Sequence, residues 1–446
     1  MRFFLTVLIC KTFIFLLKAM GRKGTSAPGK LAFKLYPDIL RVFQKKVRKE
    51  IIAVMGTNGK TTTNNMLADI LESEGNVVAC NRIGANMDEG SVVAFIEKTK
   101  IFGKTKIDYA CLEMDEGWAE YIFKFITPHK IVVGNLFRDQ LDRYGEIDTT
   151  MEFIRRAIRL APDATLVLNA DDPLTVAMAE PFENKKIFYG IKDKVCEYNS
   201  KSKEGKYCHF CKEPLDYSFH HFSQLGDYSC TCGFKRPDAD FNAKDITLFP
   251  KINFTLENYG NISFNSRGMY NIYNILASSA TALNCGVKFE TIQKNALSYK
   301  PQIGRMQEFN ISGKEIYLIL AKNPTGFNQS VYAVCEDIRK KDILIGINDA
   351  ISDGQDISWL WDVDFEALIN ENSLSFTTSG RRFADMALRL KYADVNSEKI
   401  HLATNLKESL KGLIESKESE VLYILANYTA LFETEAILKE LEKDAD

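Results

Sequence analysis

The chain has 446 residues, more than one hydrophobic core usually organises, so two or three domains are expected. Hydrophobic residues make up 46% and charged residues 26%, the composition of an ordinary folded soluble protein. The formal net charge of −2 gives no overall reason to expect nucleic acid or an anionic membrane as the main partner.

The first eighteen residues, MRFFLTVLICKTFIFLLK, are mostly apolar. The run FFLTVLIC resembles the core of a signal peptide, but Lys11 interrupts the pattern soon after it. Before Lys18 the apolar run is also too short and too broken to span a bilayer. We expect an N-terminal helix that packs on the protein or touches a membrane surface, with a signal sequence as the alternative. The next segment, SAPGKLAFKLYPDIL (26–40), has two prolines and two turn signals, which predict a connector.

A strand, a glycine-rich turn and a helix follow in that order. EIIAVM (50–55) is a continuous apolar run, as expected of a buried parallel strand. The turn GTNGKT (56–61) comes next, and the apolar residues of the segment after it have helical spacing up to Gly75. The common phosphate loop has four residues between its first glycine and the Gly-Lys pair, whereas two stand here. The sequence therefore predicts a short phosphate loop, which belongs to a cytoplasmic protein.

In such a loop, glycines let backbone N–H groups approach phosphate oxygens, and the helix N-terminus adds a favourable field. We expect Lys60 to lie against the β- and γ-phosphates and the hydroxyl of Thr61 to ligate Mg²⁺. An ordinary glycine turn before a helix is the alternative. The predicted nucleotide-binding residues of the loop are Gly56, Thr57, Asn58, Gly59, Lys60, Thr61 and Thr62.

The same alternation of strand and helix recurs, which predicts a parallel sheet with helices on both faces. Helical patterns such as TTMEFIRRAIRLA separate the strands, and ligands should bind at the carboxyl ends of the strands. The expected strands are IDYACLEM (107–114), KIVVGNLF (130–137) and ATLVLNADDP (164–173).

Acidic residues follow two of these strands. Glu113, Asp115 and Glu116 end the first, and Asp139, Asp142 and Glu146 follow the second. Most of them are expected to be surface or helix-cap residues. Mg²⁺ takes few protein carboxylates and keeps several waters, so one acid is enough, and Glu113 is the predicted ligand because it is nearest the strand.

Four of the ten cysteines stand in two close pairs, CHFC (208–211) and CTC (230–232). This spacing in a long chain favours a reducing compartment and a structural zinc site formed by Cys208, Cys211, Cys230 and Cys232. Four unrelated buried thiols are the alternative, and His209, His220 or His221 could substitute as ligands. The cysteines lie in an insertion at about 196–237, where acids alternate with the lysines, so no nucleic-acid surface is expected.

Beyond the insertion the sequence predicts strand-like runs in INFTLENYGNISF (252–264) and a helix in GMYNIYNILASSATALNCG (268–286). A new α/β pattern begins near residue 303, with strands in EIYLILAKNP, DILIGIND and LYILANY. The expected division is an N-terminal helix and connector (1–43), a central ATP-binding domain (44–304) and a smaller C-terminal α/β domain (305–446).

These motifs together resemble the Mur ligase superfamily, whose short phosphate loop is matched by GTNGKTTT and whose later nucleotide-contacting motifs are matched by LNADDP and GMYNIYNILASSATA. Within it, the chain is most similar to the MurT-type subunits of lipid II isoglutaminyl synthase. That similarity rests on the four-cysteine insertion, NLFRDQLDRYGE, GINDAISDGQDISWLWD and SGRRFADMALRLKYA, and it covers about residues 30–446.

The resemblance implies an enzyme that amidates the α-carboxylate of D-glutamate in the stem peptide of lipid II, at the inner face of the membrane. It would use ATP and Mg²⁺ to convert the carboxylate into an acyl phosphate, which ammonia attacks. A partner glutaminase of the GatD type (class I) would supply the ammonia in a heterodimer, since no glutaminase site is visible in this chain. Asn271 and Asn274 would contact the adenine region and Arg305 would approach the phosphates.

The resemblance also makes predictions about three further positions. Amino-acid-adding relatives have a metal-binding histidine where Gln140 stands and a carbamylated lysine where Arg156 stands, so the number of metal ions is in doubt and Arg156 could supply a fixed positive charge. In this family an aspartate of the C-terminal domain is thought to complete the Cys-His pair of the glutaminase. Asp349 matches it. Asp353 and Asp356 are alternatives, and a loop-capping role is another.

Two other functions remain open from the sequence. One is a stand-alone Mur or folylpolyglutamate-type ligase that adds an amino acid, which the cysteine insertion, Gln140 and Arg156 disfavour. The other is a nucleotide-binding scaffold without chemistry, which the intact Lys60 and Thr61 pair disfavours. Lipid II and a soluble precursor cannot be distinguished as the substrate.

Overall fold

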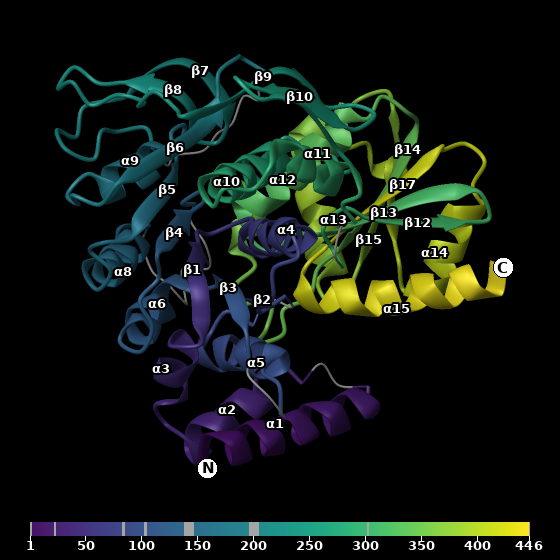
Figure 1. The fold of residues 1–446 in the computed structure, drawn as a ribbon. Coiled ribbons are helices and arrows are strands. Elements are labelled where there is room, and N and C mark those ends of the chain that lie inside the picture. The colour runs from purple at the N-terminus through teal and green to yellow at the C-terminus, as the bar shows by residue number, and fades with distance from the viewer. Residues whose placement is uncertain are drawn as a thin grey trace.

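The computed structural model describes residues 2–21, 24–82, 85–101, 105–137, 147–195, 205–300 and 303–445. Within this part of the chain, two mixed sheets covered by helices lie beside each other, and a small hairpin extends from the first of them (Figure 1). This is the α/β architecture that the sequence predicts.

The first sheet has nine strands among the described residues, in the order β11-β10-β9-β6-β5-β4-β1-β3-β2. Neighbouring strands from β2 to β9 are parallel, whereas β10 pairs antiparallel with both β9 and β11. The strands expected from the apolar runs are confirmed. Their bounds are β1 (Val47–Met55), β2 (Val78–Cys80), β3 (Ile107–Glu113), β4 (Lys130–Val133), β5 (Thr165–Asn169), β6 (Lys186–Ile191), β9 (Phe241–Thr247), β10 (Ile252–Leu256) and β11 (Gly260–Phe264).

Helices bury both faces of this sheet, because alternate residues of each strand point to opposite sides. Ile51 and Ala53 of β1 pack into one hydrophobic cluster, and Ile52 and Val54 pack into the other. The second cluster contains residues of α4 (Lys60–Ser73), α10 (Tyr270–Asn284) and α11 (Phe289–Leu297). The first contains residues of α1 (Arg2–Ala19), α2 (Ala27–Leu35), α3 (Ile39–Gln44), α5 (Asp88–Lys98), α6 (Glu116–Phe123), α8 (Ile147–Arg159) and α9 (Pro173–Ala179).

The second sheet has the order β12-β13-β17-β14-β15-β16, and its strands are parallel except for β12. Its strands are β12 (Gln307–Ile311), β13 (Lys314–Leu320), β14 (Lys341–Gly346), β15 (Ser373–Ser379), β16 (Ile400–Leu402) and β17 (Val421–Ala426). Its helices are α12 (Pro324–Glu336), α13 (Phe383–Tyr392), α14 (Leu406–Glu415) and α15 (Tyr428–Ala445), with the 3-10 helices η1 (Ser358–Asp362), η2 (Phe365–Leu368) and η3 (Ser397–Lys399).

The hydrophobic clusters of the two sheets share no residue. Those of the first sheet end at Tyr299, and those of the second begin at Met306. We therefore propose the domain boundary at residues 304 and 305, as the sequence suggested. The insertion contributes the hairpin β7 (Asp216–Phe222) and β8 (Leu225–Ser229).

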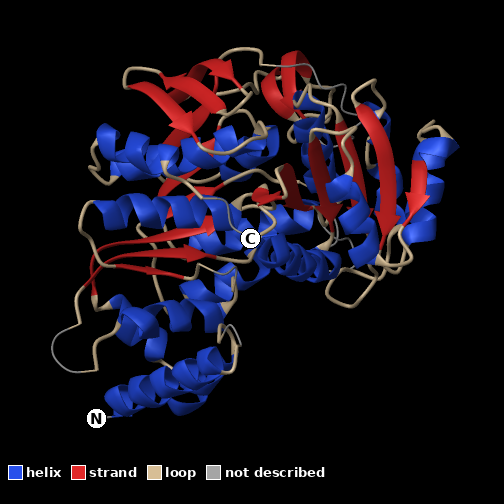
Figure 2. Ribbon diagram, turned by 90° about the vertical axis from the view of Figure 1, so that its right-hand side faces the viewer, coloured by secondary structure: helices blue, strands red, loops and turns tan. Residues whose placement is uncertain are grey.

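The N-terminal region differs in part from its prediction. The expected helix is confirmed as α1, which contacts α2 and α5 at the outer edge of the molecule, next to the N-terminus in Figures 1 and 2. The prediction of a connector at 26–40 is wrong, because α2 and the first two residues of α3 lie there. Pro28 occupies the first turn of α2, where its missing N–H costs no hydrogen bond. No helix in the described part of the chain is both long enough and apolar enough to cross a membrane.

Candidate active site and cysteine cluster

A cleft of about 670 Å³ lies between the two sheets, at the carboxyl ends of β1, β3 and β13. The first domain contributes the glycine-rich loop and the acids that follow β3. The second domain contributes the segment around Lys322, the first turns of α12 and one face of α15. The cleft therefore lies beyond the strand ends of both sheets, where ligands are predicted to bind.

The glycine-rich loop has a backbone that only glycine tolerates at two positions. Gly56 has φ +122° and Gly59 has φ +86°, both in the left-handed region. A Cβ atom on Gly59 would lie 2.1 Å from Oδ1 of Asn274, so α10 packs directly against the loop. The N–H of Thr57 donates to the carbonyl of Asn135 at 2.9 Å, which ties the loop to the end of β4.

Lys60 lies at the start of α4 and forms a buried ion pair that the sequence did not indicate. Its Nζ donates to Oε1 and Oε2 of Glu116 at 2.9 and 3.2 Å, and Oε1 also accepts the N–H of Gly56 at 2.8 Å. Glu116 is 4% exposed, so the expectation of a surface or capping acid is wrong for this residue. Asp115 is a helix cap, as expected, because its carboxylate accepts the N–H of Gly117. Its side chain is buried, so it is not a surface residue.

Electrostatics keep Lys60 charged. Burial lowers its pKa, but the carboxylates of Glu116 and Glu113 outweigh burial and raise the pKa above the ordinary value. Glu113 is 3% exposed, and burial raises its pKa despite the opposing effects of Lys60, a hydrogen bond from Thr61 and Arg305. The two residues predicted as Mg²⁺ ligands, Thr61 and Glu113, are therefore neighbours.

Oε2 of Glu113 has no hydrogen-bond partner among the described residues. A buried carboxylate oxygen without a donor is costly unless a cation satisfies it. Hard cations such as Mg²⁺ prefer oxygen ligands of this kind, so Thr61 and Glu113 fit a magnesium site.

The two predicted asparagines of α10 lie beside the loop. Nδ2 of Asn274 donates to Oδ1 of Asn271 at 2.9 Å, and Thr63 donates to Oδ1 of Asn274 at 3.5 Å. Both asparagines line the cleft, as does Arg305. Contact of the asparagines with adenine and of Arg305 with phosphate stays a prediction.

The second domain provides residues that sequence analysis missed. Asn323 caps α12 by accepting the N–H of Gly326 at 2.7 Å, and its Nδ2 donates to Oδ1 of Asn58 in the loop at 3.5 Å. Gln329, one turn further, is buried in the cleft wall, and its Nε2 lacks a partner within the described structure. The sequence offered a signal for Asn323, because this residue lies at the end of the predicted strand EIYLILAKNP.

The three candidate aspartates of the second domain have different surroundings. Asp353 is 2% exposed and accepts the N–H and the hydroxyl of Thr429 at 2.8 and 2.5 Å, which assigns it to the loop structure. Asp356 accepts the N–H of Ser358, the first residue of η1, at 2.8 Å. Asp349 is partly exposed, and its Oδ2 lies 3.7 Å from Nη1 of Arg382. It is not among the described residues that line the cleft.

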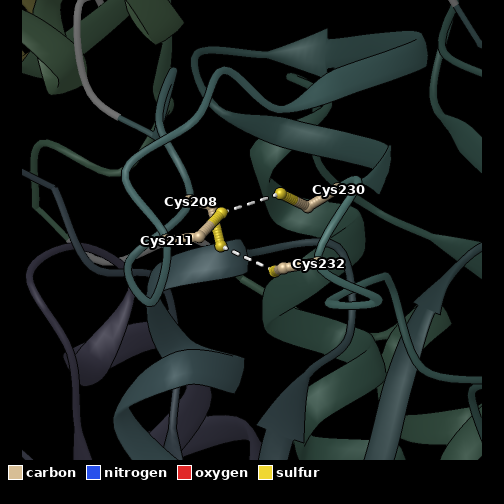
Figure 3. A group of neighbouring side chains, drawn as sticks. All are labelled: Cys208, Cys211, Cys230 and Cys232. Atoms are coloured by element: carbon tan, nitrogen blue, oxygen red, sulfur yellow. Dashed lines mark hydrogen bonds between the residues drawn. The ribbon is translucent and has the colours of Figure 1, made fainter.

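The predicted metal ligands of the insertion come together. The four sulfur atoms of Cys208, Cys211, Cys230 and Cys232 all lie within 4.8 Å of one another (Figure 3). The alternative of four unrelated thiols is therefore wrong. Four converging sulfurs fit a tetrahedral zinc ion.

The insertion is bonded to the sheet near the cleft. Nε2 of Gln224 donates to the carbonyl of Leu136 at 2.6 Å, and Nε of Arg236 donates to Asp171 at 2.7 Å. Asp171 is buried and also accepts the hydroxyl of Tyr273 on α10 at 2.8 Å. Hydrogen bonds thus connect the insertion to the ends of β4 and β5 and to α10, which lie beside the glycine-rich loop.

Gln140 and Arg156 are the two positions where the sequence departs from amino-acid-adding Mur ligases, and the structure describes only the second. Gln140, with Asp139, Asp142 and Glu146, lies outside the described residues. Arg156 is described, and it is exposed on α8, with its Nε 3.5 Å from Glu152 of the same helix. A fixed positive charge at the cleft from Arg156 is therefore not supported.

Comparisons with known proteins agree with this arrangement. The Mur ligase middle domain matches residues 54–230, and the MurT ligase C-terminal domain matches residues 320–431. The chain is 36% identical over 423 residues to the MurT subunit of the glutamine-hydrolysing lipid II isoglutaminyl synthase of Staphylococcus aureus (strain COL), covering 93% of this chain and 92% of that one. It is 35% identical over 429 residues to the same subunit of Streptococcus pneumoniae, covering 95% and 94%.

Solved structures show the same fold at lower identity. A pseudomurein peptide ligase type C of Methanothermus fervidus is similar with a TM-score of 0.68 and 22% identity, over 90% of this chain and 80% of that one. MurF of Acinetobacter baumannii is similar with a TM-score of 0.67 and 20% identity, over 93% and 80%. With two matching domains in order and relatives that align over almost the whole chain, this protein belongs to the MurT family of ligases, within the Mur ligase superfamily.

Proposed function

We propose that this protein is the ATP-dependent subunit of a lipid II isoglutaminyl synthase, which amidates the α-carboxylate of D-glutamate to give D-isoglutamine. The relatives that align over 93% and 95% of the chain are named as subunits of a lipid II isoglutaminyl synthase. The observation that carries the proposal is the cleft itself, in which Lys60, Thr61 and the unsatisfied oxygen of Glu113 face the second domain.

The chemistry must overcome the poor reactivity of a carboxylate, which is anionic and has a poor leaving group. One carboxylate oxygen attacks the γ-phosphorus of ATP, the bond to the bridging oxygen breaks, and ADP leaves. Ammonia then attacks the carbonyl carbon of the acyl phosphate, a proton is lost from nitrogen, and orthophosphate leaves with the former carboxylate oxygen. Such transfers depend mostly on positioning and on neutralisation of charge.

The residues of the loop perform the positioning. Backbone N–H groups of the loop, including that of Gly56, and the Lys60 ammonium would hold the phosphates, and Asn323 would keep the second domain against the loop. Thr61 and Glu113 would hold Mg²⁺, which when bound neutralises charge on the phosphates. Glu116 now bonds both Gly56 and Lys60, so it must release them to phosphate oxygens.

The nitrogen source in this proposal is a glutaminase of the GatD type, bound at the second domain. Asp349 would orient the histidine of the partner's Cys-His pair. Support comes from its partial exposure and from the exposed apolar residues near it in the chain, Ile351 (90% exposed) and Trp361. Exposed apolar residues in the segment that follows an accessible carboxylate suit a protein partner that completes an active site there. Because lipid II is anchored in the membrane, we propose that amidation takes place at the cytoplasmic face of the membrane.

The test is amide formation on lipid II by the purified chain with ATP and ammonium chloride, without glutaminase and without any amino acid. Product is expected, and one ¹⁸O atom from labelled carboxylate should appear in each orthophosphate. Lys60→Ala should abolish the reaction. A requirement for an added amino acid would favour the stand-alone ligase, and full activity of Lys60→Ala would favour the scaffold. Either result, or amide without transfer of ¹⁸O, would overturn the proposal.

A further inference from the structure

The N-terminal helix α1 is apolar on two sides, and only one of them is covered. Thr6, Val7, Cys10, Ile14 and Leu17 are buried, and the apolar members of this set belong to or border the core on that side of the sheet. The opposite side faces away from the protein. Its apolar residues, each 42% to 71% exposed, are Phe4, Leu5, Leu8, Ile9, Phe15, Leu16 and, one residue past the helix, Met20.

The exposed apolar residues form one face, with Thr12 within it, whose hydroxyl donates to the carbonyl of Leu8 at 3.1 Å. At about 100° per residue, the six within the helix lie in an arc of roughly 140°. Arg2 borders one edge of this arc, and Lys11 and Lys18 border the other. The two lysines reach back to α5, where they bond the carbonyl and the carboxylate of Glu97 at 3.1 and 2.7 Å. These contacts lie at one edge of the apolar face, which is turned outward because the other side of the helix is buried.

The charge of this region contrasts with the rest of the chain. The first 49 residues contain twelve Lys and Arg and one acidic residue, Asp38, a formal charge of +11. Residues 50–446 carry −13, which gives the −2 of the whole chain. The overall net charge therefore hides a strongly basic segment, and it is this segment that bears the exposed apolar face. Lys30, Lys34, Arg41 and Lys45 of this segment are exposed as well.

We propose that the exposed face of α1 binds an anionic lipid bilayer. An apolar helix face surrounded by cationic residues inserts into the boundary between headgroups and acyl chains, and each basic residue near an anionic surface adds to the binding. A second copy of this chain would meet the same +11 charge, and mutual repulsion opposes that pairing. Charge complementarity therefore favours lipid over self-association. The inference goes beyond the proposed function, since binding to vesicles does not require amidation.

The test uses the full-length chain and sedimentation with vesicles. Vesicles of phosphatidylglycerol and phosphatidylcholine in equal amounts should bind the protein, vesicles of phosphatidylcholine alone should bind it weakly, and added salt should reduce binding. The double variant Leu5→Glu with Leu16→Glu places two charges on the exposed face. Its partition coefficient should fall about tenfold or more.

Leu297→Glu with Leu388→Glu is the matched control, because these two leucines are 54% and 49% exposed on helices elsewhere and the added charge is the same. This control should bind as the unmodified chain does. Circular dichroism should show that all three proteins are folded. Equal binding of the double variant, or no binding of the unmodified chain to anionic vesicles, would overturn the proposal. So would a dimer, seen by sedimentation velocity, that the double variant dissociates while vesicle binding is absent. Amidation of a soluble substrate analogue by the double variant should be unchanged, so failure here is distinct from failure of the proposed function.

Discussion

The buried pair of Glu116 and Lys60 makes a quantitative prediction about nucleotide binding. The Glu116 carboxylate takes the Lys60 ammonium and the N–H of Gly56, with distances of 2.8 to 3.2 Å. These are donors that a phosphate loop offers to phosphate oxygens. A nucleotide must therefore compete with Glu116, and the substitution Glu116→Gln keeps the shape of the competitor while removing its charge.

Glu116→Gln should lower the stability of the nucleotide-free protein and raise its affinity for ADP. Without nucleotide, Glu116→Gln should lose about 2 kcal/mol of stability, because it weakens the charged hydrogen bonds to Lys60 and Gly56. The loss is limited because the Gln carbonyl still accepts a hydrogen bond and the Glu113 carboxylate still interacts with Lys60. The same free energy no longer opposes phosphate binding. Affinity for ADP with Mg²⁺ should therefore rise by up to about thirtyfold.

Thermal denaturation with and without ADP, together with titration calorimetry, measures both effects. Glu120→Gln is the control on the same helix, because Glu120 pairs with Lys124 at 3.7 Å on the surface. Its effect should stay within about 0.5 kcal/mol. If Glu116→Gln binds ADP more weakly than the unmodified chain, Glu116 belongs to the nucleotide site and the reasoning is refuted.

Three further predictions concern other parts of the chain. Asp349→Asn should reduce glutamine-dependent amidation, assayed with the glutaminase, at least about a hundredfold, while ammonium-dependent amidation and the Asp356→Asn control change less than about twofold. Removal of the metal by a chelator should release one zinc per chain, detected by mass spectrometry, and should speed hydrogen exchange at Gly226, whose N–H donates to the carbonyl of Asp171. Burial raises the pKa of Asp172 to about 6, above its ordinary value of 3.8. The folded state therefore binds the Asp172 proton more tightly than the unfolded state does, and the stability of the protein falls as pH rises from 3.8 to 6. Denaturant titrations should therefore show Asp172→Asn gaining up to about 3 kcal/mol relative to the unmodified chain from pH 4 to pH 7, and a constant difference would contradict this.

Much of the fold could be predicted because its signals are local. Buried parallel strands are continuous apolar runs, and a phosphate loop needs its strand, glycines and helix in immediate succession. The two cysteine pairs likewise carry their ligand spacing within short segments. The sequence failed at 26–40, where prolines suggested a connector. A proline in the first turn of a helix leaves the helix intact, and residues of α2 and α3, such as Ala32 and Phe43, are then buried against the core.

The sequence by itself determined the α/β class, the short phosphate loop at 56–62, the cysteine cluster and the apolar N-terminal helix. Only the tertiary structure decided that Glu116 bonds Lys60, that Asn323 reaches the loop from the second domain, and that Arg156 points to solvent. It also decided which side of α1 is covered. Local patterns record the neighbours along the chain, whereas ion pairs between separate elements and the burial of a helix face depend on which distant segments pack together.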